Sequence, residues 1–298
     1  MMSDFLAPVF QTGFFDSAAV HTAVLIGAVV AVVAAALGVF TVMRAQSFAA
    51  EALGDIGTTG GAGAYLVGVG PLAGFLVFGV LAAAAMELVG IQRARGRDLA
   101  TGIVLGAALG LAALFFYLDS TVNNTTGATV TVLFGSIFTI PTSTIPVVAA
   151  LAAVVVAILL VIHRPLLLST VSTEIATARG VPVRLVGAIY LFALAAAVAL
   201  CSLTIGSILS TALLIGPAAA ALRLTRRPGR AVLLAAALGV FAMWLGIVLA
   251  YDSYYWPPHG TSWPVSFFVV SIVFVTYLLS GLPGWRERRR ARATTRRG

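Results

Sequence analysis

The sequence has no lysine, a single cysteine and few charged residues of any kind. Charged residues make up 9% of the 298 positions, whereas hydrophobic residues make up 60%. Soluble domains usually contain about 25% charged residues. Without lysine the chain cannot form a Walker-A loop, because the lysine of that motif binds the nucleotide phosphates. If ATP drives this protein, a separate chain must hydrolyse it.

The scarcity of cysteine and histidine excludes several further classes of site. The lone Cys201 excludes an intramolecular disulfide and a thiolate metal cluster. The three histidines, His21, His163 and His259, are scattered along the chain and do not form the constellation that a membrane-embedded metalloenzyme needs. We therefore predict a chain that is not an enzyme, with no catalytic residues and no bound cofactor.

Long apolar runs dominate what is present, and each approaches the roughly 20 residues that cross a bilayer. They predict an all-α polytopic membrane protein with about nine transmembrane helices, eight being the alternative count. No polar linker separates the runs, so we expect one transmembrane domain over residues 1–285 and a basic tail over 286–298. The expected spans are 18–43, 47–69, 71–92, 99–118, 146–163, 185–205, 207–222, 231–250 and 264–282.

All 18 basic residues are arginines, and they fall on alternate connections between the expected spans. The other connections contain acids such as Asp119 and Asp252 and no arginine. The positive-inside rule then places the N-terminus outside and the C-terminus in the cytoplasm, and we expect a bacterial inner membrane. We interpret the tail as an anchor near anionic lipid headgroups, not as a nucleic-acid site, because no folded domain accompanies it.

Two acids, Glu51 and Asp55, interrupt the second expected span, which is otherwise apolar and rich in glycine. Residues four apart share one face of a helix. A carboxylate at the centre of a bilayer costs about 2.5–3.5 kcal/mol, so such acids usually face a polar cavity or an ion path. The alternative is a position at the cytoplasmic interface, because Glu51 is only seven residues beyond Arg44.

Three other segments depart from plain spans. Residues 165–184 predict a capped cytoplasmic helix of about eight residues, which is either a surface connector or a docking element for a soluble partner. Gly216 and Pro217 lie within the seventh expected span and predict a kink or gate. The outer connection 119–145 is rich in β-branched residues and predicts a re-entrant or interfacial piece that covers the pathway.

Two GxxxG pairs predict close helix packing. Gly57–Gly61 lies in the second expected span and Gly106–Gly110 in the fourth. Glycine at this spacing lets two helix backbones approach closely.

The order and spacing of five segments resemble the permease subunits of metal-type ABC importers, the ABC-3 family that moves zinc, manganese or iron(II). The resemblance covers roughly Phe15 to Leu282. The segments are LGVFTVMRAQSFAAEALGD, RDLATGIVLG with Asp98, LFGSIF, STEIATARGVPV and SILSTALLIGPAAAALRLT. The family's usual Asp-x-x-x-His is replaced here by Glu51 and Asp55, and Ser136 replaces its usual acid, which is more like an actinobacterial side branch.

The resemblance implies a homodimeric permease subunit that translocates a divalent cation, zinc or manganese, into the cytoplasm. Cytoplasmic ABC ATPase subunits would use the ATP and dock at Glu174, Ala178 and Gly180, and an extracytoplasmic metal-binding protein would deliver the cation. Glu51 and Asp55 would be transit ligands, and their oxygens suit manganese better than zinc. The alternatives are an ion-coupled secondary transporter and an ABC permease of this family that has drifted to a non-metal substrate.

Overall fold

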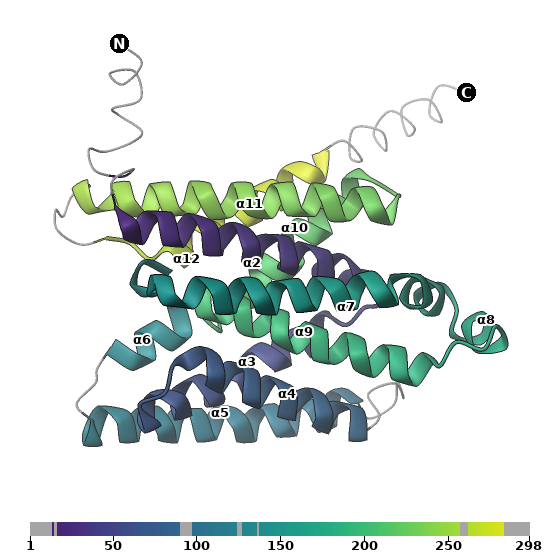
Figure 1. Ribbon diagram of the computed structural model, residues 1–298, viewed down its shortest axis with the longest axis horizontal. Coiled ribbons are helices and arrows are strands. Elements are labelled where there is room, and N and C mark those ends of the chain that lie inside the picture. Colours follow the sequence, from purple (N-terminus) through teal and green to yellow (C-terminus); the bar gives the residue numbers. More distant parts are fainter. Residues whose placement is uncertain are drawn as a thin grey trace, which may run out of the picture.

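The computed structural model describes residues 14, 17–89, 97–123, 127–135, 137–256 and 262–282, without the side chains of 89, 97–101 and 103. The described residues form helices and no strands, which confirms the predicted all-α class (Figure 1). Asp98 therefore has a described backbone only, and Ser136, His259 and the tail 286–298 lie outside the described residues. The helices are α2 (Ala18–Met43), α3 (Ser47–Val67), α4 (Pro71–Val89), α5 (Arg97–Val122), α6 (Gly127–Phe134), α7 (Ile145–Val171), α8 (Thr173–Ala178), α9 (Val183–Ile205), α10 (Ser210–Leu224), α11 (Pro228–Asp252) and α12 (Val265–Ser280), with short 3-10 turns η1 (Ile137–Thr139), η2 (Thr142–Thr144) and η3 (Ser253–Tyr255).

Six of the described helices are long and apolar enough to cross a membrane, namely α2, α4, α5, α7, α9 and α11. The helices α10 and α12 are apolar but have only 15 and 16 residues. Helix α3 has 21 residues, and its two acids, glycines and threonines lower its hydropathy. Each expected span overlaps one of these helices, and the count of about nine crossings stays a prediction.

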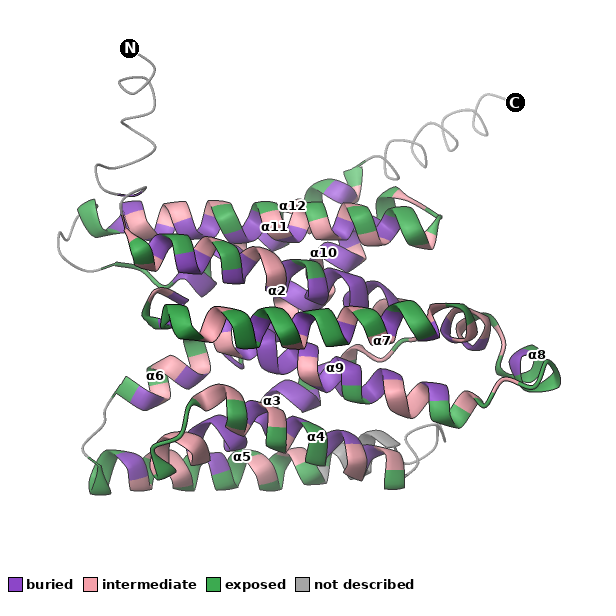
Figure 2. Ribbon diagram, in the orientation of Figure 1, coloured by how far each residue is buried: buried purple, intermediate pink, exposed green. Residues whose placement is uncertain are grey.

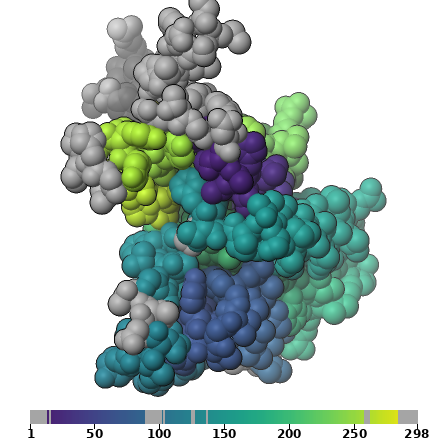
Figure 3. All heavy atoms as spheres, turned by 60° about the vertical axis from the view of Figure 1, so that its left-hand side comes forward, coloured from purple at the N-terminus to yellow at the C-terminus, as the bar shows by residue number. Residues whose placement is uncertain are grey.

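The helices form two groups with a bridge between them (Figure 1). Helix α2 packs with α10 and α11, and α12 packs on α10 and α11. Helix α3 packs with α4 and α5 in the second group, and α7 and α9 lie between the groups. Figure 3 shows the blue helices and the yellow-green helices on opposite sides of the molecule. The chain passes from the first group to the second in the short turn between α2 and α3.

Burial distinguishes the central helices from the peripheral ones (Figure 2). The apolar windows of α2 and α9 are 67% and 72% buried, whereas that of α5 is 11% buried. An apolar helix that stays exposed within one subunit must be covered by lipid or by another chain. The core of this subunit therefore runs along α2 and α9, with α5 at its edge.

The largest difference from the predicted helix ends lies at the end of α7. Helix α7 continues past residue 163, through Pro165, and ends at Val171. The hydroxyls of Ser169 and Thr170 donate to the Leu166 carbonyl at 2.9 and 2.7 Å, which keeps these polar residues within the helix. The short capped helix predicted within 165–184 is therefore α8, with six residues in place of about eight.

Helices α3 and α4 approach closely at a glycine pair that the GxxxG pattern did not single out. A Cβ atom added to Gly60 of α3 would lie 2.1 Å from the carbonyl oxygen of Gly74 in α4, so only glycine permits this contact. Gly61 packs instead on the Phe75 ring. Gly106 and Gly110 face open space within the subunit, so the packing predicted for them is not formed within this chain.

Candidate functional site

The acid pair lies on α3, one helical turn apart, as predicted. Glu51 is exposed and Asp55 is half-buried. Asp55 is eight residues beyond Ser47, which places it about 12 Å along the helix axis at a rise of about 1.5 Å per residue. Glu51 lies about 6 Å from the same helix start. The two carboxylates therefore differ in depth, and the interfacial alternative applies better to Glu51 than to Asp55.

The neighbouring face of α3 packs tightly on the start of α10. A Cβ atom at Gly54 would lie 3.0 Å from Ser210 Oγ and 3.5 Å from the Ser207 carbonyl oxygen. The glycine at this position brings α3 close to the turn before α10, and this packing fixes the helix that holds the acid pair. Thr58, one turn beyond Gly54, donates to the Gly54 carbonyl at 3.3 Å.

No larger group of candidate metal ligands accompanies the pair within the described residues. In the part of the chain that the structure describes, no group of three or more histidine, cysteine or acidic residues gathers to hold a metal ion. Two carboxylates provide hard oxygen ligands and leave most of a coordination sphere to water or to another chain. Such an incomplete site suits transient passage better than tight storage.

The segment that follows α7 forms the short capped helix that the sequence indicated. The backbone N–H of Ile175 donates to Ser172 Oγ at 3.2 Å, and Glu174 lies in the first turn. Gly180 ends the helix with a φ of +76°, which glycine adopts without strain. Its N–H donates to the Thr177 carbonyl at 2.9 Å.

This helix projects from one end of the bundle, at the right of Figure 1. Ala176 is buried and anchors it, whereas Glu174, Ala178 and Gly180 are exposed. The three predicted docking residues thus share an accessible surface, and their contact with an ATPase stays a prediction.

Gly216 and Pro217 lie within α10, which runs from Ser210 to Leu224 through the proline. A Cβ atom at Gly216 would lie 2.1 Å from Val273 Cγ1 of α12. Close packing on α12 accounts for the glycine, and the gating role stays a prediction.

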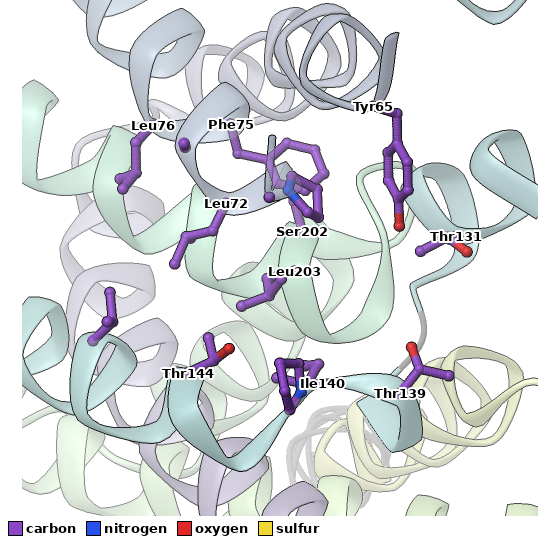
Figure 4. A pocket seen from close by; sticks show the side chains of 15 residues that line it. Tyr65, Leu72, Phe75, Leu76, Thr131, Thr139, Ile140, Thr144, Ser202 and Leu203 are labelled. Atoms are coloured by element: carbon purple, nitrogen blue, oxygen red, sulfur yellow. The ribbon is translucent and has the colours of Figure 1, made fainter. Parts of the chain in front are cut away.

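A pocket, seen from close by in Figure 4, lies beside α6, at the end of the bundle opposite to α8 in Figure 1. Its volume is about 470 Å³, and the 119–145 connection contributes α6, η1 and η2 residues to its wall. The lining combines apolar side chains with the hydroxyls of Tyr65, Thr131, Thr139, Thr144 and Ser202. Neither Glu51 nor Asp55 lines it, so the structure does not bring the pocket and the acid pair together.

Backbone contacts hold α6 beside this pocket. The Ser207 N–H and hydroxyl donate to the Val132 carbonyl at 3.0 and 3.2 Å. Gly135 and Gly206 have φ values of +73° and +88°, and a Cβ atom at Gly206 would lie 2.2 Å from the Leu133 carbonyl oxygen. The β-branched segment is thus largely helical, and Gly206 allows its close approach to the end of α9.

Arg44 was not predicted from the sequence to contact other helices. The structure places its guanidinium against Ser169 and Thr170 of α7 and over the Tyr190 ring of α9. These partners are more than 120 residues away in sequence, with separations of 125 and 126 for the two hydrogen bonds. The only sequence signal was the run of hydroxyl residues just before α8.

The chain is similar to known proteins over most of its length. The sequence model of the ABC 3 transport family matches residues 16–280. The manganese transport system membrane protein MntC of Listeria innocua is 28% identical over 83% of this chain and 85% of its own length. The chelated iron transport system membrane protein YfeC of Yersinia pestis is 32% identical over 77% of this chain and 76% of its own.

A solved structure has the same fold. The structure of PsaBC from Streptococcus pneumoniae in complex with Fab matches with a TM-score of 0.77 and 22% identity, over 94% of this chain and 95% of that chain. The family match over most of the chain confirms the resemblance seen in the sequence. The chain therefore belongs to the ABC 3 transport family, whose curated members include multi-pass membrane permeases of metal transport systems.

Proposed function

We propose that this chain is the permease subunit of an ABC importer that moves a divalent cation into the cytoplasm, with manganese favoured over zinc. The family match over residues 16–280 is the observation that carries the proposal. Relatives named for manganese, chelated iron and zinc transport leave the cation open. The oxygen-only pair Glu51 and Asp55 favours manganese, because zinc more often takes nitrogen or sulfur ligands.

Two copies of the chain would enclose the path. The pair Glu51 and Asp55 gives two carboxylates in each copy, so a symmetric dimer with the two pairs facing its axis would bring four together. The little-buried α5 leaves apolar surface for lipid or for a second copy to cover. Each carboxylate lowers the cost of holding a dication in a low-dielectric layer.

The other partners follow from the two ends of the bundle. The arginine-bearing turn between α10 and α11 lies at the same end of the bundle as α8 (Figure 1), and the positive-inside rule assigns this end to the cytoplasm. We propose that ATPase subunits dock on α8 there, at Glu174, Ala178 and Gly180. An external binding protein would deliver the cation at the opposite end, where the pocket beside α6 lies.

Radiometal uptake tests this function. The chain is expressed with its cognate ATPase and binding protein in cells that lack their own manganese and zinc importers. We expect saturable uptake of radiolabelled manganese, with excess unlabelled manganese competing better than zinc. Stronger competition by zinc would overturn the preference for manganese, and uptake of neither metal would overturn the proposed function.

A further inference from the structure

The turn between α2 and α3 holds an arginine in a defined position. Arg44 caps α2, and the N–H of Gln46 donates back to the Thr41 carbonyl at 2.9 Å. Ala45 between them has a φ of +52°, in the left-handed region that residues other than glycine rarely adopt. The Ala50 N–H then donates to the Gln46 carbonyl at 3.1 Å as α3 begins. The turn therefore links Arg44 rigidly to the first turn of α3.

The guanidinium reaches across to the last turn of α7. It donates to Ser169 Oγ at 3.1 Å and to Thr170 Oγ1 at 3.4 Å, while Nε donates to Gln46 Oε1 at 3.3 Å. Both hydroxyls give their own hydrogens to the Leu166 carbonyl, so their lone pairs are left to accept from Arg44. A planar group with several fixed donors suits this arrangement, and an ammonium does not.

The same guanidinium also contacts α9. Its central carbon lies 5.5 Å from the centroid of the Tyr190 ring, within the range of a cation–π interaction. Tyr190 is fully buried, and its hydroxyl is 2.7 Å from Thr41 Oγ1 and donates to the Leu37 carbonyl at 3.3 Å. Arg44 thus joins the α2–α3 turn to both bridging helices, α7 and α9.

The positive-inside rule needs only the charge of Arg44 and does not require these contacts. Arg164, Arg179 and Arg184 contribute to the positive side and are exposed, whereas Arg44 is half-buried. Its hydrogen-bond partners in the described part of the chain are neutral groups. Burial lowers the pKa of Arg44 from its ordinary value. A charge kept in such surroundings costs solvation free energy, which these contacts offset.

Arg44 stands between the two elements that the proposed function must connect. On one side, Thr170 is the second-last residue of α7, and Ser172 directly after that helix caps α8. On the other side, the rigid turn leads into α3, where Glu51 lies seven residues beyond Arg44. We propose that Arg44 is a positioning residue that passes movement of α8 to α3, so that the acid pair responds to the ATPase cycle. This inference rests on the proposed function.

The test uses the complete complex of permease, ATPase and binding protein in liposomes, and it measures manganese transported per ATP hydrolysed. Arg44→Lys keeps the charge that sets topology and loses the three-way donation. The pair Ser169→Ala and Thr170→Ala keeps Arg44 and removes its α7 partners. Arg223→Lys is the matched control, because Arg223 is an exposed arginine whose guanidinium contacts the ring and hydroxyl of Tyr277 in α12.

We expect both the Arg44 variant and the Ser169/Thr170 variant to keep basal ATP hydrolysis and to lose about tenfold in manganese per ATP, within the usual range of coupling between sites. Combining them should cause little further loss, because they break the same contact. The Arg223 control should match the wild type. Three results would each overturn the role of Arg44. The Ser169/Thr170 variant could transport as much manganese per ATP as the wild type, or the combined variant could lose the product of the two single losses. The Arg223 control could also lose as much as the Arg44 variant. A wild-type complex that moves no manganese would instead refute the proposed function.

Discussion

Asp55 is the single residue on which the proposed cation path depends most. It is half-buried about 12 Å into α3, where water and headgroups solvate a carboxylate less well than at a helix end. Glu51 is exposed nearer the start of the helix. Removal of the deeper carboxylate should therefore impair passage more than removal of the shallower one.

Replacement of Asp55 by Asn tests this residue. The amide keeps the shape and one oxygen but loses the charge, so we expect manganese uptake to fall by at least about tenfold, the effect of roughly 1.4 kcal/mol. The amount of protein in the membrane should not fall, because a neutral side chain inserts more easily. Glu87→Gln in α4 is the control, since it neutralises another half-buried acid in a neighbouring helix. Uptake at the wild-type level by Asp55→Asn would refute the path assignment.

Glu51→Gln should give an intermediate rate of manganese uptake. Glu51 is exposed, so water can partly replace the oxygen charge that the substitution removes. The measurement is initial uptake normalised to protein in the membrane, with Asp55→Asn and wild type alongside. A loss larger than that of Asp55→Asn would reverse the order of the two residues and contradict the depth argument.

Single residues with a chemical signature could be found from the sequence. Glu51 and Asp55 are conspicuous because acids are rare in apolar spans, and Glu174 because it follows a cluster of capping residues. The environment of Arg44 could not be found, because its partners come from α7 and α9 and meet it only in the folded bundle. The contact between Gly60 and Gly74 was hidden for the same reason, since it depends on how α3 and α4 pack.

At the level of elements, the backbone conformation of Gly180 ends helix α8. No atom lies within 4 Å of a Cβ atom added there, so a side chain would meet no steric obstacle. Its φ of +76° nevertheless costs other residues about 1–2 kcal/mol. A larger residue should therefore change the shape of the α8 end without disturbing the bundle.

Gly180→Leu should weaken binding of the cognate ATPase, measured by co-purification and by the affinity of the detergent-solubilised permease for the ATPase. Gly229→Leu is the matched control, because that glycine also has no atom within 4 Å of an added Cβ and has no positive φ. The control should bind normally. If both variants bound the ATPase as tightly as the wild type, α8 would lose its docking role.

The packing of α3 on α4 makes a separate prediction. Gly60→Ala should destabilise the folded permease by about 1–3 kcal/mol, because its Cβ would overlap the Gly74 carbonyl and push the helices apart. Gly106→Ala should be neutral or slightly stabilising, because its Cβ meets open space. Thermal unfolding in detergent compares the two. Equal stability of the two variants would contradict the close approach of Gly60 to the Gly74 carbonyl.

The elements themselves were largely predictable, because each expected span coincides with an apolar helix. The errors lie where helix ends depend on local hydrogen bonds. Helix α7 passes Pro165 and keeps Ser169 and Thr170 through bonds to the Leu166 carbonyl, which hydropathy does not register. The connection 119–145 was predicted to be a re-entrant or interfacial piece, which stays a prediction, and the sequence did not indicate that contacts with the end of α9 hold part of it as helix α6.

At the scale of the whole molecule, one chain cannot complete the proposed transport cycle. The sequence has no lysine for a nucleotide-binding loop. In the described part of the chain, one copy gathers too few ligands to enclose a cation. The account therefore requires an ATPase for energy and a second copy for the path, and it makes ATP the source of energy in place of an ion gradient.

Manganese uptake into liposomes tests whether the permease depends on an ATPase for energy. The permease is reconstituted with its ATPase and binding protein, and radiolabelled manganese is supplied together with the binding protein. The account predicts uptake that requires ATP and the ATPase and persists when ionophores collapse proton and sodium gradients. The permease alone should hydrolyse no ATP and accumulate no manganese. Uptake by the permease alone, driven by an imposed proton or sodium gradient, would contradict the account and identify an ion-coupled carrier.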